Sequence, residues 1–231
     1  MNVAIVVAAG KGTRLGAGRP KQFLELGGVP VIVHTLKQFE RSQKISEVIT
    51  VLPAEETAGF ESLAQQFQLA KAKHAVAGGA TRAQSVRNGL KAIREAEIVA
   101  VHDGVRPFVT PDEIDQVVAA STETGAAVLT ARVADTIKRV RGARIIETIT
   151  RAELQRALTP QCFRFDILKR AYETLDELES TGLEITDESL LVEQLGIEIV
   201  AVEGSARNIK ITNAEDLAFG EAILESVVSG Q

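Results

Sequence analysis

Short apolar runs alternate with longer segments in which apolar residues recur every three to four positions along most of the chain. The runs predict strands at 3–7, 48–52, 73–76, 98–102, 126–131 and 197–202. The periodic segments predict helices at 31–39, 55–67, 83–94, 112–121, 166–178, 188–194 and 214–226. Strands that alternate with helices form βαβ units around a parallel sheet. We therefore expect an α/β fold, with a Rossmann-like, mostly parallel twisted sheet and helices on both of its faces.

Two of these helices begin at capping sequences. Residues 110–113 read TPDE, which places a cap, a proline at the first helical position and a reciprocating Glu in capping-box order. Residues 212–215 read TNAE and repeat the Thr-x-x-Glu pattern. The two sequences predict helices capped by Thr110 and Thr212.

Residues 130–150 interrupt the alternation of strands and helices. They read TARVADTIKRVRGARIIETIT, two β-rich runs around Gly142, and so predict a β-hairpin in which this glycine supplies a positive φ. A two-stranded hairpin is marginally stable on its own in water, so a partner subunit is the simplest surface for it to pack on. We expect one domain over 1–231, with 132–150 as an inserted dimerisation hairpin.

Composition and charge narrow the classes of protein. The 231 residues are 45% hydrophobic and 25% charged, which is typical of a globular protein. The single cysteine, Cys162, excludes an intramolecular disulfide and favours the reducing cytoplasm. We expect neither a signal peptide nor a membrane span, because no basic segment precedes the first apolar run and no run approaches roughly 20 apolar residues. A net charge of -5 and the absence of Trp disfavour broad nucleic-acid binding.

The loop after the first predicted strand concentrates positive charge. Residues 8–21 read AAGKGTRLGAGRPK, and the first acidic residue after them is Glu25. Glycines let a backbone approach a ligand, and exposed N–H groups at the carboxyl end of a strand form an anion cradle. The loop matches neither the Walker A pattern nor the complete Rossmann fingerprint, in which Leu15 would have to be glycine. We expect a polyanionic ligand, and the alternative is a loop of solvated charges.

Three further segments carry candidate chemistry. Asp103 follows a predicted strand, where a carboxylate could share a magnesium ion with a phosphate or accept a ribose hydroxyl; the alternative is a turn cap that pairs with Arg106. Residues 78–85 form a glycine turn before a helix, which either brings backbone amides to a ligand or is an ordinary turn. Lys210 stands between two apolar β-branched residues, so alternation points it either to solvent or into the crevice.

Other polar residues have a structural interpretation. We expect His102 to be a packed residue at a strand end rather than a base, and the three histidines show no metal-ligand spacing. Thr186 precedes a predicted helix and is interpreted as its N-cap. We expect Cys162 to pack as a small hydrophobic residue.

Six segments carry a resemblance to a known family. They read AAGKGTRLGAGRPKQFLEL, GGATRAQSV, HDGVRPF, ALTPQCF, TDESLLVEQLG and VEGSARNIKITNAEDL, and they span nearly the whole chain. In order and spacing they resemble the 2-C-methyl-D-erythritol 4-phosphate cytidylyltransferase family. The first segment alone is similar to nucleotidyltransferases in general. The chain departs from the family at residues 102–106, which read HDGVR where the family has HDAAR. This difference affects only the backbone beside Asp103.

The resemblance implies a homodimeric enzyme that uses CTP, Mg²⁺ and a polyol phosphate. It implies that the catalytic cations are Arg14, Lys21 and Lys210. It implies a nucleotide site formed by Ala8, Ala9, Gly10, Gly12, Gly79, Arg82 and Ser85. The substrate-binding residues that it implies are Asp103, Arg106 and Thr186, with Asp103 also near the metal, and Thr136 and Arg151 from the second subunit.

This chemistry agrees with the residue types present. The nucleophile would be a phosphate monoester, whose second pKa is about 6, so it needs no general base at neutral pH. Catalysis then consists of bringing two anions together and stabilising the charge that develops at the α-phosphorus.

The residues leave two alternative functions open. One is a cytidylyltransferase for another polyol phosphate such as ribitol 5-phosphate, and the other is a non-catalytic nucleotide-sensing module.

Overall fold

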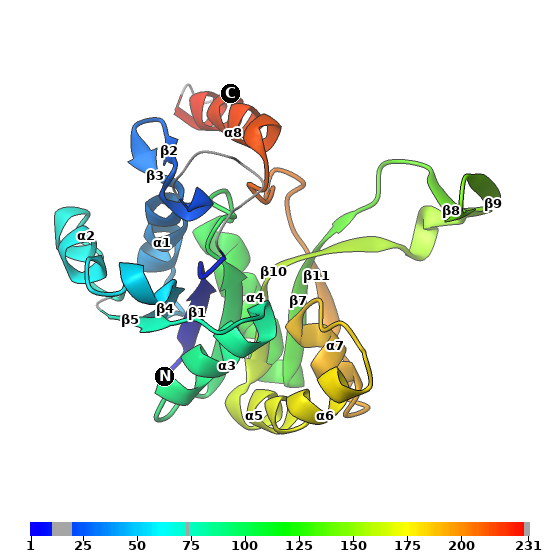
Figure 1. Cartoon of the computed structure of the whole chain (residues 1–231), viewed down its shortest axis with the longest axis horizontal. Helices are drawn as coiled ribbons and strands as arrows, with labels where there is room; N and C mark the ends of the chain where they lie inside the picture. The colour runs from blue at the N-terminus through cyan, green and yellow to red at the C-terminus, as the bar shows by residue number, and fades with distance from the viewer. Residues whose placement is uncertain (11–19, 73, 229–231) are drawn as a thin grey trace.

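A seven-stranded sheet forms the centre of the computed structural model, which describes residues 1–10, 20–72 and 74–228 (Figure 1). The strand order is β11-β7-β10-β6-β1-β4-β5. The strands are β1 (Val3–Val7), β4 (Glu47–Leu52), β5 (Ala75–Ala77), β6 (Ile98–Asp103), β7 (Ala126–Arg132), β10 (Gln155–Arg164) and β11 (Val200–Glu203). Neighbouring strands are parallel except for the two pairs that β10 makes. The predicted mostly parallel sheet is therefore confirmed.

The strand β10 was missed by the sequence prediction. It lies between β6 and β7 and runs antiparallel to both, with Cys162 opposite Ala100 and Ala127. Its first residues are polar, and the register shifts between Ala157 and Gln161, around a proline. Polar residues and a proline at a bulge hide the apolar pattern of a strand. Cys162 is fully buried, as expected of a small hydrophobic residue.

Helices cover both faces of the sheet, as predicted. Ala4 and Val6 of β1 belong to one apolar cluster, whereas Val3 and Ile5 belong to the other. The first cluster includes α1 (Val31–Arg41), α2 (Phe60–Gln66) and α4 (Pro111–Thr124). The second includes α3 (Arg82–Ala92), α5 (Phe165–Glu173), α6 (Leu175–Ser180) and α7 (Glu188–Glu193). Burial on both faces explains why the strands are continuous apolar runs.

Several predicted boundaries differ from the structure. The helix expected at 55–67 is a short 3-10 turn, η3 (Ala54–Glu56), followed by α2. The helix expected at 166–178 is split into α5 and α6 at Thr174, whose hydroxyl donates to the Ala171 carbonyl at 2.9 Å. A side chain that bonds the preceding turn in this way competes with continuous helix geometry.

The first predicted helix cap is confirmed and the second shifts by one residue. Thr110 and Glu113 form both hydrogen bonds of a capping box at α4. At α8 (Ala214–Val228), the Asn213 side chain accepts from the Asp216 amide at 2.8 Å, and the Asp216 carboxylate accepts from the Asn213 amide at 3.0 Å. The cap is therefore Asn213 rather than Thr212, in agreement with the stronger capping preference of Asn.

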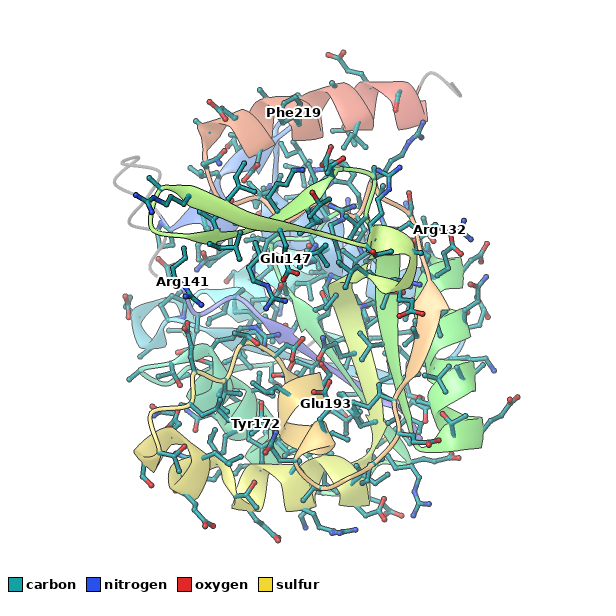
Figure 2. All side chains as sticks on the ribbon, turned by 90° about the vertical axis from the view of Figure 1, so that its right-hand side faces the viewer. Arg132, Arg141, Glu147, Tyr172, Glu193 and Phe219 are labelled. Atoms are coloured by element: carbon teal, nitrogen blue, oxygen red, sulfur yellow. The ribbon has the colours of Figure 1, made fainter. Side chains whose placement is uncertain are left out.

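The predicted hairpin is present as an arm that extends away from the sheet (Figure 1). It consists of β8 (Ile137–Arg141) and β9 (Arg144–Ile149), joined at Gly142 with φ +58, and the 3-10 turn η4 (Arg151–Glu153) follows. Figure 2 shows the arm in front of the body. Val140, Ile145 and Ile146 on it are 54%, 65% and 51% exposed, so a single chain leaves this apolar surface uncovered.

The small hairpin of β2 (Glu25–Leu26) and β3 (Val29–Pro30) follows the 3-10 turn η2 (Lys21–Phe23). It is tied to α8, because the Glu221 carboxylate accepts from the Gly27 amide at 3.0 Å. Among the helices of the described residues, none combines the length and the hydropathy needed to cross a membrane.

Candidate active site

A cavity of about 530 Å³ opens at the carboxyl ends of the parallel strands. Five separate segments contribute to its wall: the end of β1 and the loop after it, the turn η2, the glycine turn with the start of α3, the end of β6, and the segment between β11 and α8. The predicted site residues that line it are Ala8, Ala9, Gly10, Lys21, Gly79, Arg82, Ser85, Asp103 and Lys210. A larger and more open hollow of about 690 Å³ lies beside α5, but its Arg164 pairs with Asp166, and no predicted site residue in the described part of the chain lines it.

Asp103, at the end of β6, is the centre of the charge arrangement. Its carboxylate lies 3.1 Å from Arg82 Nε, 3.2 Å from Arg106 Nε and 3.0 Å from Lys210 Nζ. Burial opposes its negative charge, but Arg82, Lys210 and Arg106 outweigh burial and hold the pKa of Asp103 well below its usual range. Asp103 is therefore an ionised carboxylate within a cluster of cations.

The structure shows where Asp103 and Lys210 lie, two residues for which the sequence left alternatives open. Asp103 pairs with Arg106, as the turn interpretation expects, and it also lines the cavity. Its contact with a metal ion or a ribose stays a prediction. Lys210 points into the crevice, and its side chain is 36% exposed.

The glycine turn packs directly against the loop after β1. A Cβ on Gly78 would lie 2.2 Å from the Ala9 side chain, so only glycine permits this approach. Ser85 Oγ accepts from the Gly79 amide at 3.0 Å and donates to the Thr81 carbonyl at 2.8 Å, which closes the turn at the start of α3. The two segments are therefore adjacent, and both contribute to the wall of the cavity.

The remaining predicted residues fall into two groups. Arg14 and Gly12 lie outside the described residues. Within the described part of one chain, Thr136, Arg151 and Thr186 are exposed and none of them lines the cavity. Arg151 donates to the Ala134 carbonyl within the arm. The N-cap of α7 is Asp187, not Thr186, because the Asp187 carboxylate accepts from the Leu190 amide at 3.1 Å.

His102 is buried behind Asp103, as expected of a packed residue. His102 Nε2 lies 3.2 Å from the Arg106 carbonyl, which can only accept, so the proton of the neutral ring lies on Nε2. Nδ1 then accepts from Thr159 Oγ1 at 3.0 Å, and Thr159 Oγ1 in turn accepts from the Asp103 amide at 3.1 Å. Burial lowers the pKa of His102 to about 4. A neutral imidazole therefore supports the turn that carries Asp103 and Arg106.

The neutral His102 should make stability depend on pH. Because its pKa falls from 6.5 to about 4 on folding, its stabilising contribution is complete above pH 6.5 and is lost as pH falls toward 4. The free energy of unfolding should decrease by up to about 3 kcal/mol over this interval. Urea unfolding at a series of pH values measures the slope. A His102→Gln variant should lack this component, and an equal slope in both proteins would contradict the assignment.

Sequence reasoning did not single out Glu188, which accepts two hydrogen bonds from Arg82 at 2.8 and 3.0 Å. In the sequence, Glu188 is marked only by its position in the first turn of a predicted helix, where acidic residues are common because they interact favourably with the helix dipole. Its partner comes from another helix, so the sequence pattern does not contain the pairing.

The fold and the site together define an α/β protein with a cavity suited to a phosphate-bearing ligand. A cation-rich cavity at the carboxyl ends of parallel strands, between a glycine-rich loop and a glycine turn before a helix, suits a ligand with several phosphate groups.

Comparisons with known proteins identify the family. The family model described as 2-C-methyl-D-erythritol 4-phosphate cytidylyltransferase matches residues 2–226. The protein of that name from Geobacillus kaustophilus is 44% identical over 223 residues, which are 96% of each chain. The one from Bacillus velezensis is 45% identical over 225 residues, 97% of this chain and 96% of the other. The chain belongs to the 2-C-methyl-D-erythritol 4-phosphate cytidylyltransferase family.

Solved structures agree with this assignment. A 4-diphosphocytidyl-2C-methyl-D-erythritol synthase from Anaerococcus prevotii has a TM-score of 0.84 and 29% identity, and the match covers 97% of this chain and 96% of that one. A 2-C-methyl-D-erythritol 4-phosphate cytidylyltransferase from Thermus thermophilus has a TM-score of 0.78 and 32% identity, over 97% of this chain and 100% of that one. The resemblance found in the sequence and the predicted fold class are both confirmed.

Proposed function

We propose that this protein transfers CMP from CTP to 2-C-methyl-D-erythritol 4-phosphate. The products are 4-diphosphocytidyl-2-C-methyl-D-erythritol and pyrophosphate, in the non-mevalonate route to isoprenoid precursors. The main support, beside family membership, is the cavity in which Lys21, Lys210 and Asp103 meet the two glycine-containing turns.

The cavity suits this reaction because the substrate supplies its own nucleophile. A phosphate oxygen of the polyol phosphate attacks the α-phosphorus of CTP, the α–β bridging bond breaks, and pyrophosphate leaves with the bonding electrons. The dianionic phosphate needs no base. No histidine is among the described residues that line the cavity. Lys21 and Lys210 offer positive charge to the phosphate oxygens as the transition state forms.

Mg²⁺ fits the cavity as a companion of the nucleotide. Within the described segments, no three His, Cys, Asp or Glu side chains cluster as a metal site, and Asp103 is the one carboxylate among the described cavity-lining residues. Mg²⁺ commonly uses one or two carboxylates together with substrate phosphates, so Asp103 is the residue that would hold it. When bound, Mg²⁺ neutralises charge on the triphosphate and favours departure of pyrophosphate.

We also propose that the active form is a homodimer joined through the 132–150 arm. Three apolar side chains on the arm are more than half exposed in one chain, which supports burial against a partner. Thr136 and Arg151 belong to the arm region and do not line the cavity of their own chain, so they are available to the partner's site.

We propose a cytoplasmic location for the protein. It is supported by the single, buried Cys162, because a reducing compartment keeps thiols free.

Purified protein with Mg²⁺, CTP and 2-C-methyl-D-erythritol 4-phosphate should release pyrophosphate. We expect turnover with CTP to exceed turnover with UTP or ATP, and EDTA to abolish it, because the metal neutralises the triphosphate. A coupled pyrophosphate assay with each nucleotide measures this. Faster turnover with ribitol 5-phosphate would favour the related cytidylyltransferase, and CTP binding without pyrophosphate release would favour a sensing module.

A further inference from the structure

Arg82 bridges the cavity and the interior of the protein. Its Nε lies 3.1 Å from Asp103 Oδ1, and its two terminal nitrogens lie 2.8 and 3.0 Å from the two oxygens of Glu188. The Arg82 side chain is 24% exposed and lines the cavity, whereas the Glu188 side chain is 0% exposed. Glu188 therefore cannot touch a ligand and can act on one only through Arg82.

Glu188 is itself held from two sides. The hydroxyl of Tyr172, the single tyrosine of the chain, donates to Glu188 Oε1 at 3.0 Å from α5. Burial raises the pKa of Tyr172 well above its usual value, so the donor proton stays in place. Gln161 of β10 accepts from the backbone amide of Glu188 at 3.1 Å and donates to Asp187 at 3.0 Å. Figure 2 places Tyr172 in the half of the body opposite α8.

These contacts keep the Arg82 guanidinium charged and fix its orientation. A planar guanidinium that makes a two-bond contact with a carboxylate has little rotational freedom. Burial opposes the charge of Arg82, but Glu188 and Asp103 outweigh burial and raise the pKa of Arg82. Glu188 also offsets the Arg82 charge. Lys21 and Lys210 are the other cationic side chains among the described residues that line the cavity.

We propose that Glu188 and Tyr172 are positioning residues for CTP: they fix Arg82 so that its Nε orients Asp103 and its exposed edge borders the nucleotide. The proposal rests on the cytidylyltransferase function proposed above. Arg82 is the first residue of α3 and follows the turn that contains Gly79, so its orientation also affects the wall on which the nucleotide would lie. Preorganised polar groups of this kind need a second layer of contacts to keep them within the productive geometry.

A double-mutant cycle between positions 82 and 188 tests the proposal. Glu188→Gln removes the negative charge with nearly the same shape, and kcat/KM for CTP should fall about tenfold or more, the range found when outer partners of functional ligands are lost. Arg82→Gln should also lower it. In the Arg82→Gln background, Glu188→Gln should change kcat/KM less than about twofold, because no guanidinium is left to position.

Tyr172→Phe gives a second, milder variant in case Glu188→Gln does not fold. It removes one hydrogen bond to Glu188 and keeps the ring, so kcat/KM for CTP should fall about threefold or more, again only when Arg82 is present.

Asp115→Asn is the matched control. The Asp115 carboxylate accepts from the amides of Gln43 and Lys44 at 3.0 and 3.1 Å, away from the cavity, so this variant should lower the melting temperature and leave kcat/KM unchanged.

The outcomes separate the two proposals. Inactive wild-type protein would contradict the proposed function. Active wild-type protein with equal losses from Glu188→Gln in both backgrounds would show a merely structural role for Glu188. A loss of kcat/KM in Asp115→Asn as large as that in Glu188→Gln, at a similar fall in melting temperature, would show the same. Unchanged activity in both Glu188→Gln and Tyr172→Phe would also overturn the positioning proposal.

Discussion

Replacing Lys210 with alanine should lower kcat by about 100-fold or more, the scale seen when a preorganised electrostatic donor is removed. Its ammonium group lies 3.0 Å from Asp103 and borders the cavity, and negative charge grows on the phosphates as the bond to pyrophosphate breaks. The interaction is therefore stronger in the transition state than in the ground state. Lys21→Ala should have an effect of the same scale. The resemblance in the sequence leads us to expect the same of Arg14→Ala.

Steady-state kinetics with pyrophosphate detection distinguish this role from simple binding. Lys91→Ala is a suitable control, because Lys91 is an exposed lysine near the end of α3 and does not line the cavity. It should keep the wild-type kcat. A Lys210→Ala variant with raised KM and unchanged kcat would contradict the transition-state role and would show that Lys210 binds substrate and transition state equally.

Mixing Arg151→Ala subunits with Lys21→Ala subunits should restore activity that neither variant has alone. If Arg151 acts in the site of the partner subunit, each mixed dimer contains one doubly damaged site and one intact site. Random exchange in a symmetric dimer should then restore roughly a quarter of the wild-type sites. The prediction follows from the position of Arg151 at the base of the exposed arm, outside the cavity of its own chain.

Subunit exchange has to be shown independently, by co-purification of differently tagged chains. If exchange occurs and activity is not restored, Arg151 acts within its own chain, because every site would then carry one lesion. Each variant alone should be nearly inactive, since Lys21 is expected to be a catalytic cation and Arg151 a substrate-binding residue of the partner's site. The homodimer itself is checked by the mass of the wild-type protein in solution. A monomer with full activity would exclude the shared site.

Much of the fold followed from local sequence patterns. The apolar strand at 3–7 and the amphipathic helix after Pro30 bury residues at their own periodicity, and the capping box at Thr110 is complete within four residues. The hairpin followed from a glycine between two β-rich runs. The strand β10 did not, because its polar start and its bulge remove the apolar pattern, and its burial depends on lying between β6 and β7.

The candidate site divides in the same way. By itself, the sequence determined the glycine loop, the glycine turn, the carboxylate after β6 and the likeness to one family, since each depends on residues that are close together in the chain. Only the tertiary structure decided that Lys210 points into the cavity and that Arg82 joins Asp103 to the buried Glu188, 106 residues from Arg82. Such partners are chosen by the order of strands in the sheet and by the packing of helices on it. No local pattern specifies that order, because the hydrophobic periodicity of a strand is the same whichever strand lies beside it.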